Sequence, residues 1–231
     1  MLTEFRSWRT MVRTAAGVGL AVLTACASPP TRFYTLGTAS EATIVNRTTS
    51  ADYLVDMRPV KVPAAVAKSQ LVVQVNAAQV KVLEDDRWAS PLADEIRDAL
   101  LADLIRQVGA PDWRTAAQTG EIPVYQVAVD VQRFESWPGS HTLVDAIWSV
   151  IALNGQEALT CHSTVSQPVS SGYDAIVDGH RRALSNIAAQ IAKGVRELSV
   201  RSTAHPIRLT GSPGRTGKMT LTCPALRGDQ N

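Results

Sequence analysis

The stretch "VYQVAVDVQRFESW", Val124 to Trp137, has the most regular strand pattern of the chain. Val127, Val129 and Val131 occupy alternate positions, so they share one face of an extended strand. A Pro-Gly pair at 138–139 then favours a turn, and "HTLVDAIWSVIAL" follows. An Asn-Gly pair at 154–155 favours a hairpin before "EALTCHSTVSQPV". The region 124–169 is therefore predicted to form a three-stranded antiparallel meander.

Two amphipathic helices are predicted, one before and one after this meander in the sequence. The first begins after Ser90 and Pro91, because serine caps free backbone N–H groups and proline tolerates the first helical position. It ends at Gly109. The second runs from Tyr173 to about Leu198. Apolar residues recur every three or four positions in both, so each presents one core-facing stripe. The stripes are Leu92, Ile96, Leu100, Leu104 and Val108 in the first helix, and Ile176, His180, Leu184, Ile187, Ile191, Val195 and Leu198 in the second.

Shorter strands are predicted at 32–36, 70–75 and 79–84. A further strand at 53–63 contains Pro59 and ends at Pro63, which limits it to the edge of a sheet. Strands, a helix, a meander and a last helix indicate an α+β fold. We expect a mainly antiparallel sheet with both long helices packed on one face.

The first residues have the features of an exported lipoprotein. A basic flank precedes a short apolar segment, which has fewer than the roughly 20 residues that a spanning helix needs. The segment ends in Leu23-Thr24-Ala25-Cys26, which resembles the bacterial lipobox. This resemblance implies a signal peptide over 1–25 and a lipidated Cys26 as the new N-terminus, with an ordinary signal peptide as the alternative. Two or more acyl chains anchor a protein stably. Ala27 rather than aspartate follows, which favours the outer membrane.

Composition predicts one domain of ordinary size after removal of the signal peptide. The chain has 231 residues, of which 45% are hydrophobic. Without Arg6, Arg9, Arg13 and Glu4, twenty basic residues face twenty acidic ones, so a nucleic-acid partner is not expected. We predict a tether at 26–31, a folded domain at 32–199 and a flexible basic tail at 200–231.

Two further cysteines remain if Cys26 carries lipid. In an oxidising compartment Cys161 and Cys223 could pair, which would stabilise the fold by up to about 4 kcal/mol. The alternative is two separate thiols, because spacing alone does not bring two Cα atoms within bonding range.

Several motifs together resemble the PqiC family of ABC-type transport auxiliary lipoproteins. They are the lipobox, "FYTL", "RPVKVPAAVAKSQLVVQ", "RWASPLADEIRDALLADL", "VQRFESWPG" and "SGYDAIVDGHRRALSNIAAQIA", and they cover roughly residues 32 to 198. The tail after Val200 departs from the family pattern. The resemblance implies a non-enzymatic lipoprotein on the periplasmic face of the outer membrane. It also implies an MCE-domain partner that spans the periplasm, traffic in lipid, and a ring of identical subunits as one possible assembly.

Catalytic and metal sites are not expected from the sequence. The four histidines, His141, His162, His180 and His205, do not cluster with ligand spacing, and His180 lies on an apolar stripe. Asp85, Asp86, Asp94, Glu95 and Asp98 are explained by a solvated helix start. The serines form no nucleophile elbow, and "GSPGRTGK" lacks the serine or threonine of a phosphate loop. No cofactor is expected.

Trp88 is the aromatic residue that the motifs single out. It could anchor a partner protein, since tryptophan is enriched in interface hot spots, or it could pack in the core at the helix entry. Tyr34 and Trp137 leave the same two alternatives open. Two other classes of function stay open beside transport: a lipoprotein regulator of an envelope enzyme, such as a peptidoglycan synthase activator, and a periplasmic hydrolase.

Overall fold

The computed structural model describes residues 30–37, 52–116, 122–153, 158–204 and 223. The chain divides into two units, 1–32 and 33–231, and only the exposed residues 30–32 of the first are described. The predicted signal peptide and Cys26 therefore lie outside the described residues. Within the described ranges, every helix is too short or too polar to cross a bilayer.

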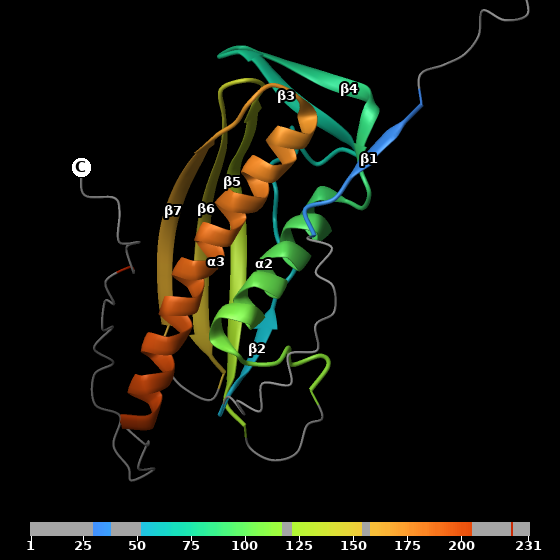
Figure 1. Ribbon diagram of the computed structural model, residues 1–231. Coiled ribbons are helices and arrows are strands. Elements are labelled where there is room, and N and C mark those ends of the chain that lie inside the picture. The colour runs from blue at the N-terminus through green and yellow to red at the C-terminus, as the bar shows by residue number, and fades with distance from the viewer. Residues whose placement is uncertain (1–29, 38–51, 117–121, 154–157, 205–222, 224–231) are drawn as a thin grey trace, which may run out of the picture. The chain divides into compact units, whose positions relative to one another are not determined.

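The predicted meander forms three of the four strands of one sheet (Figure 1). The strands β5 (Val124–Trp137), β6 (His141–Ala152) and β7 (Ala158–Pro168) pair antiparallel in sequence order. Gly139 has a φ of 70° in the β5–β6 turn, a conformation that glycine adopts without steric cost. The edge strand β2 (Leu54–Met57) pairs with β5 in parallel, which the sequence did not indicate.

The remaining described strands form a second sheet in the order β1-β4-β3. They are β1 (Arg32–Tyr34), β3 (Gln70–Asn76) and β4 (Gln79–Trp88). After β2 the chain stays beside β5 for a few residues: the Arg58 amide donates to the Val127 carbonyl and the Lys61 amide to the Val129 carbonyl. The residues after Lys61 pass into the β3–β4 hairpin, which packs against β5.

Both helices cover the same face of the four-stranded sheet, as predicted (Figure 1). They are α2 (Leu92–Val108) and α3 (Tyr173–Ala204), and α3 continues past the predicted end near Leu198. Gly109 ends α2 in the left-handed conformation, with φ 72°. Ser90 does not cap α2 through its side chain, contrary to the prediction, because its hydroxyl donates to the Glu95 carboxylate instead.

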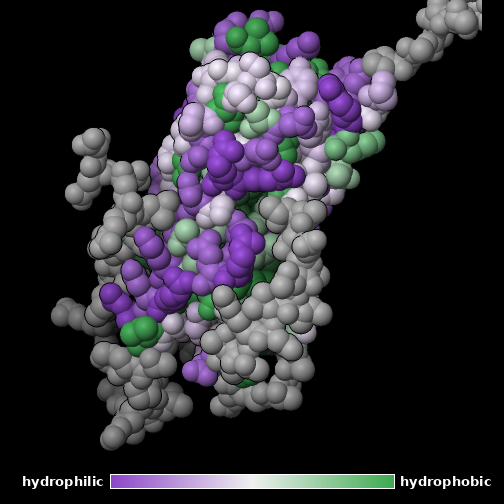
Figure 2. All heavy atoms as spheres, viewed as in Figure 1, coloured by the Kyte–Doolittle hydropathy of each residue, from purple (hydrophilic) through white to green (hydrophobic). Residues whose placement is uncertain are grey.

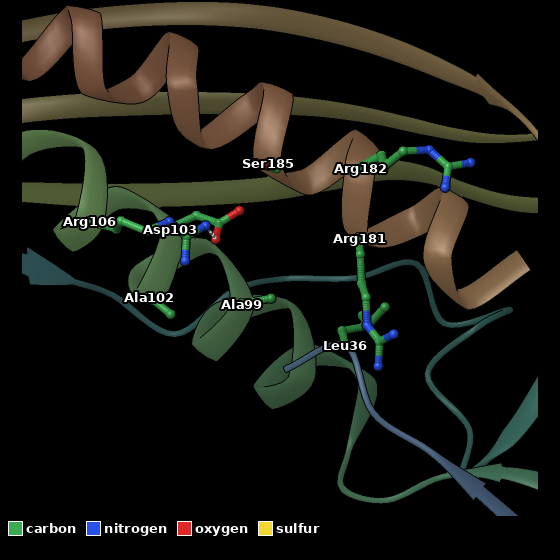
Figure 3. A pocket seen from close by; sticks show the side chains of 8 residues that line it. All are labelled: Leu36, Ala99, Ala102, Asp103, Arg106, Arg181, Arg182 and Ser185. Atoms are coloured by element: carbon green, nitrogen blue, oxygen red, sulfur yellow. Dashed lines mark hydrogen bonds and ion pairs between the residues drawn. The ribbon is translucent and has the colours of Figure 1, made fainter. Parts of the chain in front are cut away.

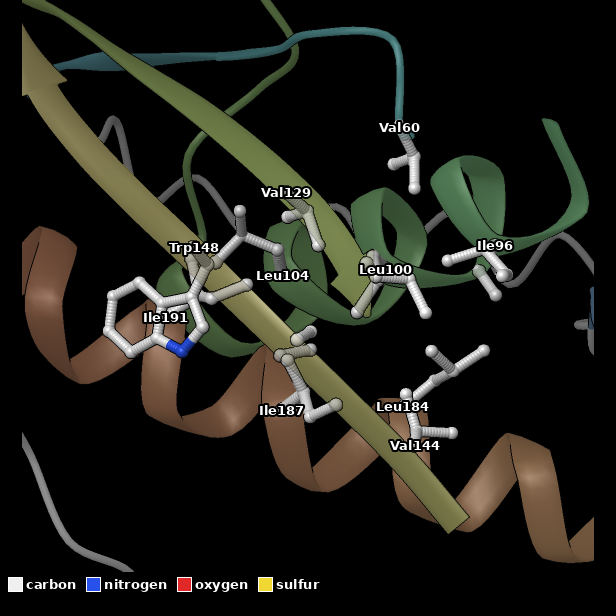
Figure 4. Packing of buried hydrophobic residues seen from close by; sticks show 14 of the residues in the cluster. Val60, Ile96, Leu100, Leu104, Val129, Val144, Trp148, Leu184, Ile187 and Ile191 are labelled. Carbon is white, nitrogen blue, oxygen red and sulfur yellow. The ribbon is translucent and has the colours of Figure 1, made fainter. Parts of the chain in front are cut away.

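The core lies between the helices and the inner face of the sheet (Figure 4). All seven residues of the predicted α3 stripe are at most 1% exposed. Opposite them lie Val144 and Trp148 of β6. Gly194 permits the close approach of α3, since a Cβ there would lie 2.8 Å from Cδ2 of Leu159 and 3.2 Å from Cζ3 of Trp148. The fold is thus α+β, with one continuous core.

Candidate functional site

The chain enters the folded body through the segment Tyr34–Gly37. The amide of Ala89 donates to the Tyr34 carbonyl at 2.7 Å. The Tyr34 hydroxyl donates to Oδ1 of Asp86 at 3.1 Å. The Leu36 side chain is 1% exposed, so this segment is part of the core rather than a loose leader.

A buried carboxylate on α2 holds this segment from a second side. Oε2 of Glu95 accepts hydrogen bonds from the Thr35 hydroxyl and the Leu36 amide, both at 2.7 Å. Oε1 accepts from the amide and the hydroxyl of Ser90 at 3.1 and 2.7 Å. The prediction of a solvated helix start is therefore wrong for Glu95, which is 6% exposed. Each of its two oxygens accepts two hydrogen bonds, which compensate for the hydration that the buried carboxylate loses.

The electrostatics of Glu95 follow from these four hydrogen bonds. Burial by itself raises the pKa of this carboxyl, because it disfavours the charged form. The donors from Ser90, Thr35 and Leu36 outweigh that effect, and the pKa lies below its ordinary value. Glu95 is therefore a negative charge with a structural task, and it stays ionised in the folded protein at neutral pH.

An arginine on α3 completes the attachment. The Arg181 guanidinium donates to the Thr35 carbonyl at 2.7 Å and to the Gly37 carbonyl at 3.5 Å. It also pairs with Asp178 one turn earlier, at 2.7 Å. We call the segment Tyr34–Gly37 together with Asp86, Glu95 and Arg181 the N-terminal clamp. It joins the start of the folded body to β4, α2 and α3.

A shallow pocket of about 200 Å³ lies beside the clamp, between α2 and α3 (Figure 3). The small side chains of Ala99, Ala102 and Ser185 leave this space open. Its charged groups are engaged: Arg106 pairs with Asp103, and Arg182, which points away from α2, donates to the Pro168 carbonyl. The lining contains no serine–histidine pair and no pair of carboxylates, so it lacks the groups of a hydrolytic site.

His180 is a core residue, as its place on the apolar stripe predicts. Its ring stacks on Phe134 with centroids 3.8 Å apart, and its Nε2 lies 2.8 Å from the Ser136 hydroxyl. Complete burial lowers the pKa of His180 to about 3, because the imidazolium would lose its hydration. The ring is therefore neutral at physiological pH.

Trp88 packs on the other side of the same cluster. It lies at the end of β4, is 5% exposed, and contacts Phe134 edge to face at a centroid distance of 6.2 Å. So little of this side chain is accessible to a partner protein that its burial favours packing in the core over a role as a partner anchor. Tyr34 is half-buried in the clamp. Trp137 stacks on His141 at the β5–β6 turn and donates to Glu135.

The other predicted sites are scattered. Asp94 and Asp98 are exposed on α2, as expected of a solvated helix start, whereas Asp86 is buried in the clamp. His162 pairs with Asp145 on the outer face of the sheet. Across the described ranges, no three histidine, cysteine or acidic side chains gather as metal ligands would. His205 and "GSPGRTGK" lie outside the described residues.

The sulfur atoms of Cys161 and Cys223 lie 2.15 Å apart, and the Cα atoms are 5.6 Å apart. Cys161 is buried on β7, and Cys223 lies beside the Thr160 carbonyl. The bond closes a loop with a sequence separation of 62. Its presence in the exported protein remains a prediction.

Replacement of Cys223 by serine is expected to lower the free energy of unfolding by about 2–4 kcal/mol, because the unfolded chain regains the entropy of the open loop. Cys223 is the better target, since it is exposed and its loss leaves no cavity. Urea unfolding with and without a dithiol reductant checks this: the reductant should destabilise the parent and leave Cys223→Ser unchanged. Two free thiols in the purified, exported protein would contradict the pairing.

The family model of the ABC-type transport auxiliary lipoprotein component matches residues 34–192. The Intermembrane transport lipoprotein PqiC of Escherichia coli K12 is 29% identical over 164 residues, which cover 70% of this chain and 82% of that protein; PqiC of Shigella flexneri matches equally.

Two solved structures share the fold. A crystal structure of an uncharacterized protein has a TM-score of 0.57 at 18% identity, and covers 72% of this chain and 99% of that one. A Xanthomonas campestris protein has a TM-score of 0.53 at 17% identity, over 66% of this chain and 88% of that one. At these identities the likeness concerns the fold alone.

Proposed function

Because this chain belongs to the family of ABC-type transport auxiliary lipoproteins, we propose that it is the outer-membrane lipoprotein of an MCE-type lipid transport system. The family serves transport rather than catalysis. The relative in Escherichia coli is named an intermembrane transport lipoprotein, which supports a place between two membranes. In this role the protein has no chemical step of its own. It connects a membrane anchor at Cys26 to a folded body that binds a periplasm-spanning MCE-domain protein.

The observation that carries the proposal is the extent of the family match. It begins at Tyr34, the first residue of the N-terminal clamp, and continues through both sheets into α3. The matched range therefore spans the clamp as well as most of the core. A clamp of this kind suits a protein whose anchor must hold a body in place, and an enzyme would need a reactive constellation that the pocket beside the clamp does not supply.

The partner is tested by purification of the full-length lipoprotein from detergent-solubilised membranes after mild crosslinking. We expect an MCE-domain protein to copurify with it, as an auxiliary transport component requires. A peptidoglycan synthase in place of any MCE-domain protein would favour the regulator alternative and overturn the proposal. Hydrolysis of an envelope substrate that depends on one carboxylate or serine of this chain would overturn it as well.

The anchor is tested by Cys26→Ala. Without a thiol to acylate, the chain is expected to remain an uncleaved precursor or to become a soluble periplasmic form, because it lacks the acyl chains that hold it in the bilayer. Membrane fractionation and the mass of the N-terminal peptide measure this. Cys223→Ser is the matched control and should keep the lipid. Normal maturation and outer-membrane recovery of Cys26→Ala would contradict the assignment.

A further inference from the structure

We propose that the end of the body that carries β1 lies against the bilayer surface, and that the Phe33 side chain contacts lipid. This inference rests on the proposed function, because it takes Cys26 as the lipid anchor. It goes further by naming the surface that faces the membrane and thereby the orientation of the body.

The covalent chain sets an upper limit on the distance from the bilayer. Phe33 is the seventh residue after Cys26, so the chain between their Cα atoms spans seven residue steps. A fully extended chain spans at most about 3.3–3.6 Å per residue, so Phe33 lies within about 25 Å of the acylated cysteine. Two prolines, Pro29 and Pro30, stiffen this short tether.

On the C-terminal side of Phe33, the N-terminal clamp fixes the chain to the folded body. The next residue, Tyr34, accepts a hydrogen bond from Ala89, just after β4, and donates one to Asp86 of β4. The two residues after it bond to Glu95 on α2, and Arg181 on α3 adds a bond to the Thr35 carbonyl. The tether therefore joins the folded body at one rigidly held point, the end that carries β1. We infer that this end lies nearest to the bilayer.

The side chain of Phe33 is apolar and yet exposed to water. It is 67% exposed although its neighbour Leu36 is buried, and it is among the most exposed large apolar side chains that the structure describes. Figure 2 shows hydrophobic atoms beside β1, surrounded by polar ones. An aromatic ring gains free energy when it leaves water for the boundary between head groups and acyl chains. The bilayer is therefore the occupant that the tether brings to this side chain.

Other exposed apolar residues provide controls, because they lie elsewhere on the body. Val200 is 68% exposed near the C-terminal end of α3, which Figure 1 shows at the opposite end from β1. Ile147 is 42% exposed on the outer face of β6. Neither is joined to the anchor by a short stretch of chain, so neither is expected to reach lipid.

The experiment introduces the photo-reactive p-benzoylphenylalanine at position 33, 147 or 200 of the full-length lipoprotein. Each variant is reconstituted in phosphatidylethanolamine–phosphatidylglycerol vesicles and irradiated, and lipid adducts are counted by peptide mass spectrometry. All three positions are exposed, so folding should be preserved, and urea unfolding verifies it. We expect several-fold more lipid adduct at position 33 than at 147 or 200.

The outcomes separate the inference from the function on which it rests. Vesicle flotation and the mass of the N-terminal peptide report whether Cys26 carries lipid. If the lipidated protein floats and position 33 gives no more adduct than positions 147 and 200, the orientation is overturned and the anchor stands. Position 33 crosslinked to another protein instead of lipid overturns the orientation in the same way. Absence of the lipid on Cys26 overturns the proposed function together with the orientation.

Discussion

Acidification below pH 6.5 is expected to destabilise this protein steeply because of His180. The folded protein keeps the ring neutral until about pH 3, whereas an unfolded histidine takes up a proton near pH 6.5. Below pH 6.5 the unfolded state therefore binds more protons, and stability falls as the pH falls. The loss is about 1.4 kcal/mol per pH unit, or roughly 5 kcal/mol by pH 3.

The variant His180→Gln should flatten this dependence, since its amide does not titrate and still reaches the hydroxyl of Ser136. Urea unfolding between pH 6.5 and 4.5 measures the slope. The Glu95 carboxyl, whose pKa is lowered by folding, contributes toward the lower end of this window, where an unfolded glutamate takes up protons, and it does so equally in both proteins. Equal slopes for His180→Gln and the parent protein would refute the assignment.

Replacement of Trp148 by alanine is expected to cost about 3–5 kcal/mol of stability, which is typical of a large aromatic residue removed from a core. The indole is 1% exposed and packs against α3 where Gly194 lets the helix approach. Its Nε1 donates to the Ser163 hydroxyl at 2.8 Å, and that hydroxyl donates to Gln190 of α3 at 2.6 Å. The substitution thus removes contacts and interrupts the hydrogen bonds that link the sheet to the helix.

Trp137→Ala is the matched control for Trp148→Ala. Trp137 is half-buried at the β5–β6 turn, where it stacks on His141 at a centroid distance of 5.6 Å. Its removal leaves no enclosed cavity, so we expect a loss of about 1 kcal/mol or less. Equilibrium urea unfolding compares the two variants. A loss below that of Trp137→Ala at position 148 would show that α3 does not depend on the indole.

Elements with a regular local pattern could be predicted from the sequence. The meander and the two helices each contain enough alternating or periodic positions to determine their type, and the α3 stripe is buried throughout. The division into two sheets could not be predicted, because it depends on the parallel pairing of β2 with β5 across some 70 residues. No local pattern reports such a contact.

The clamp was missed for a similar reason. Glu95 lies where an acidic residue suits the start of a helix, so its sequence context already explains it. Two of its partners, Thr35 and Leu36, are about 60 residues away. The burial of His180 could be predicted, because its position on the stripe is local information. Its hydrogen bond to Ser136 of β5 could not.

The predicted disulfide between Cys161 and Cys223 would join residues 161–223 into a covalent ring. A protease that cuts one peptide bond inside this ring would separate no fragment, because both pieces stay joined through sulfur. Most of the edge strand β7 and all of the helix α3 lie within the ring, and they would thus stay connected after a single cut. In the proposed exported lipoprotein, one cut within the ring would therefore release a fragment only after a reductant opened this disulfide.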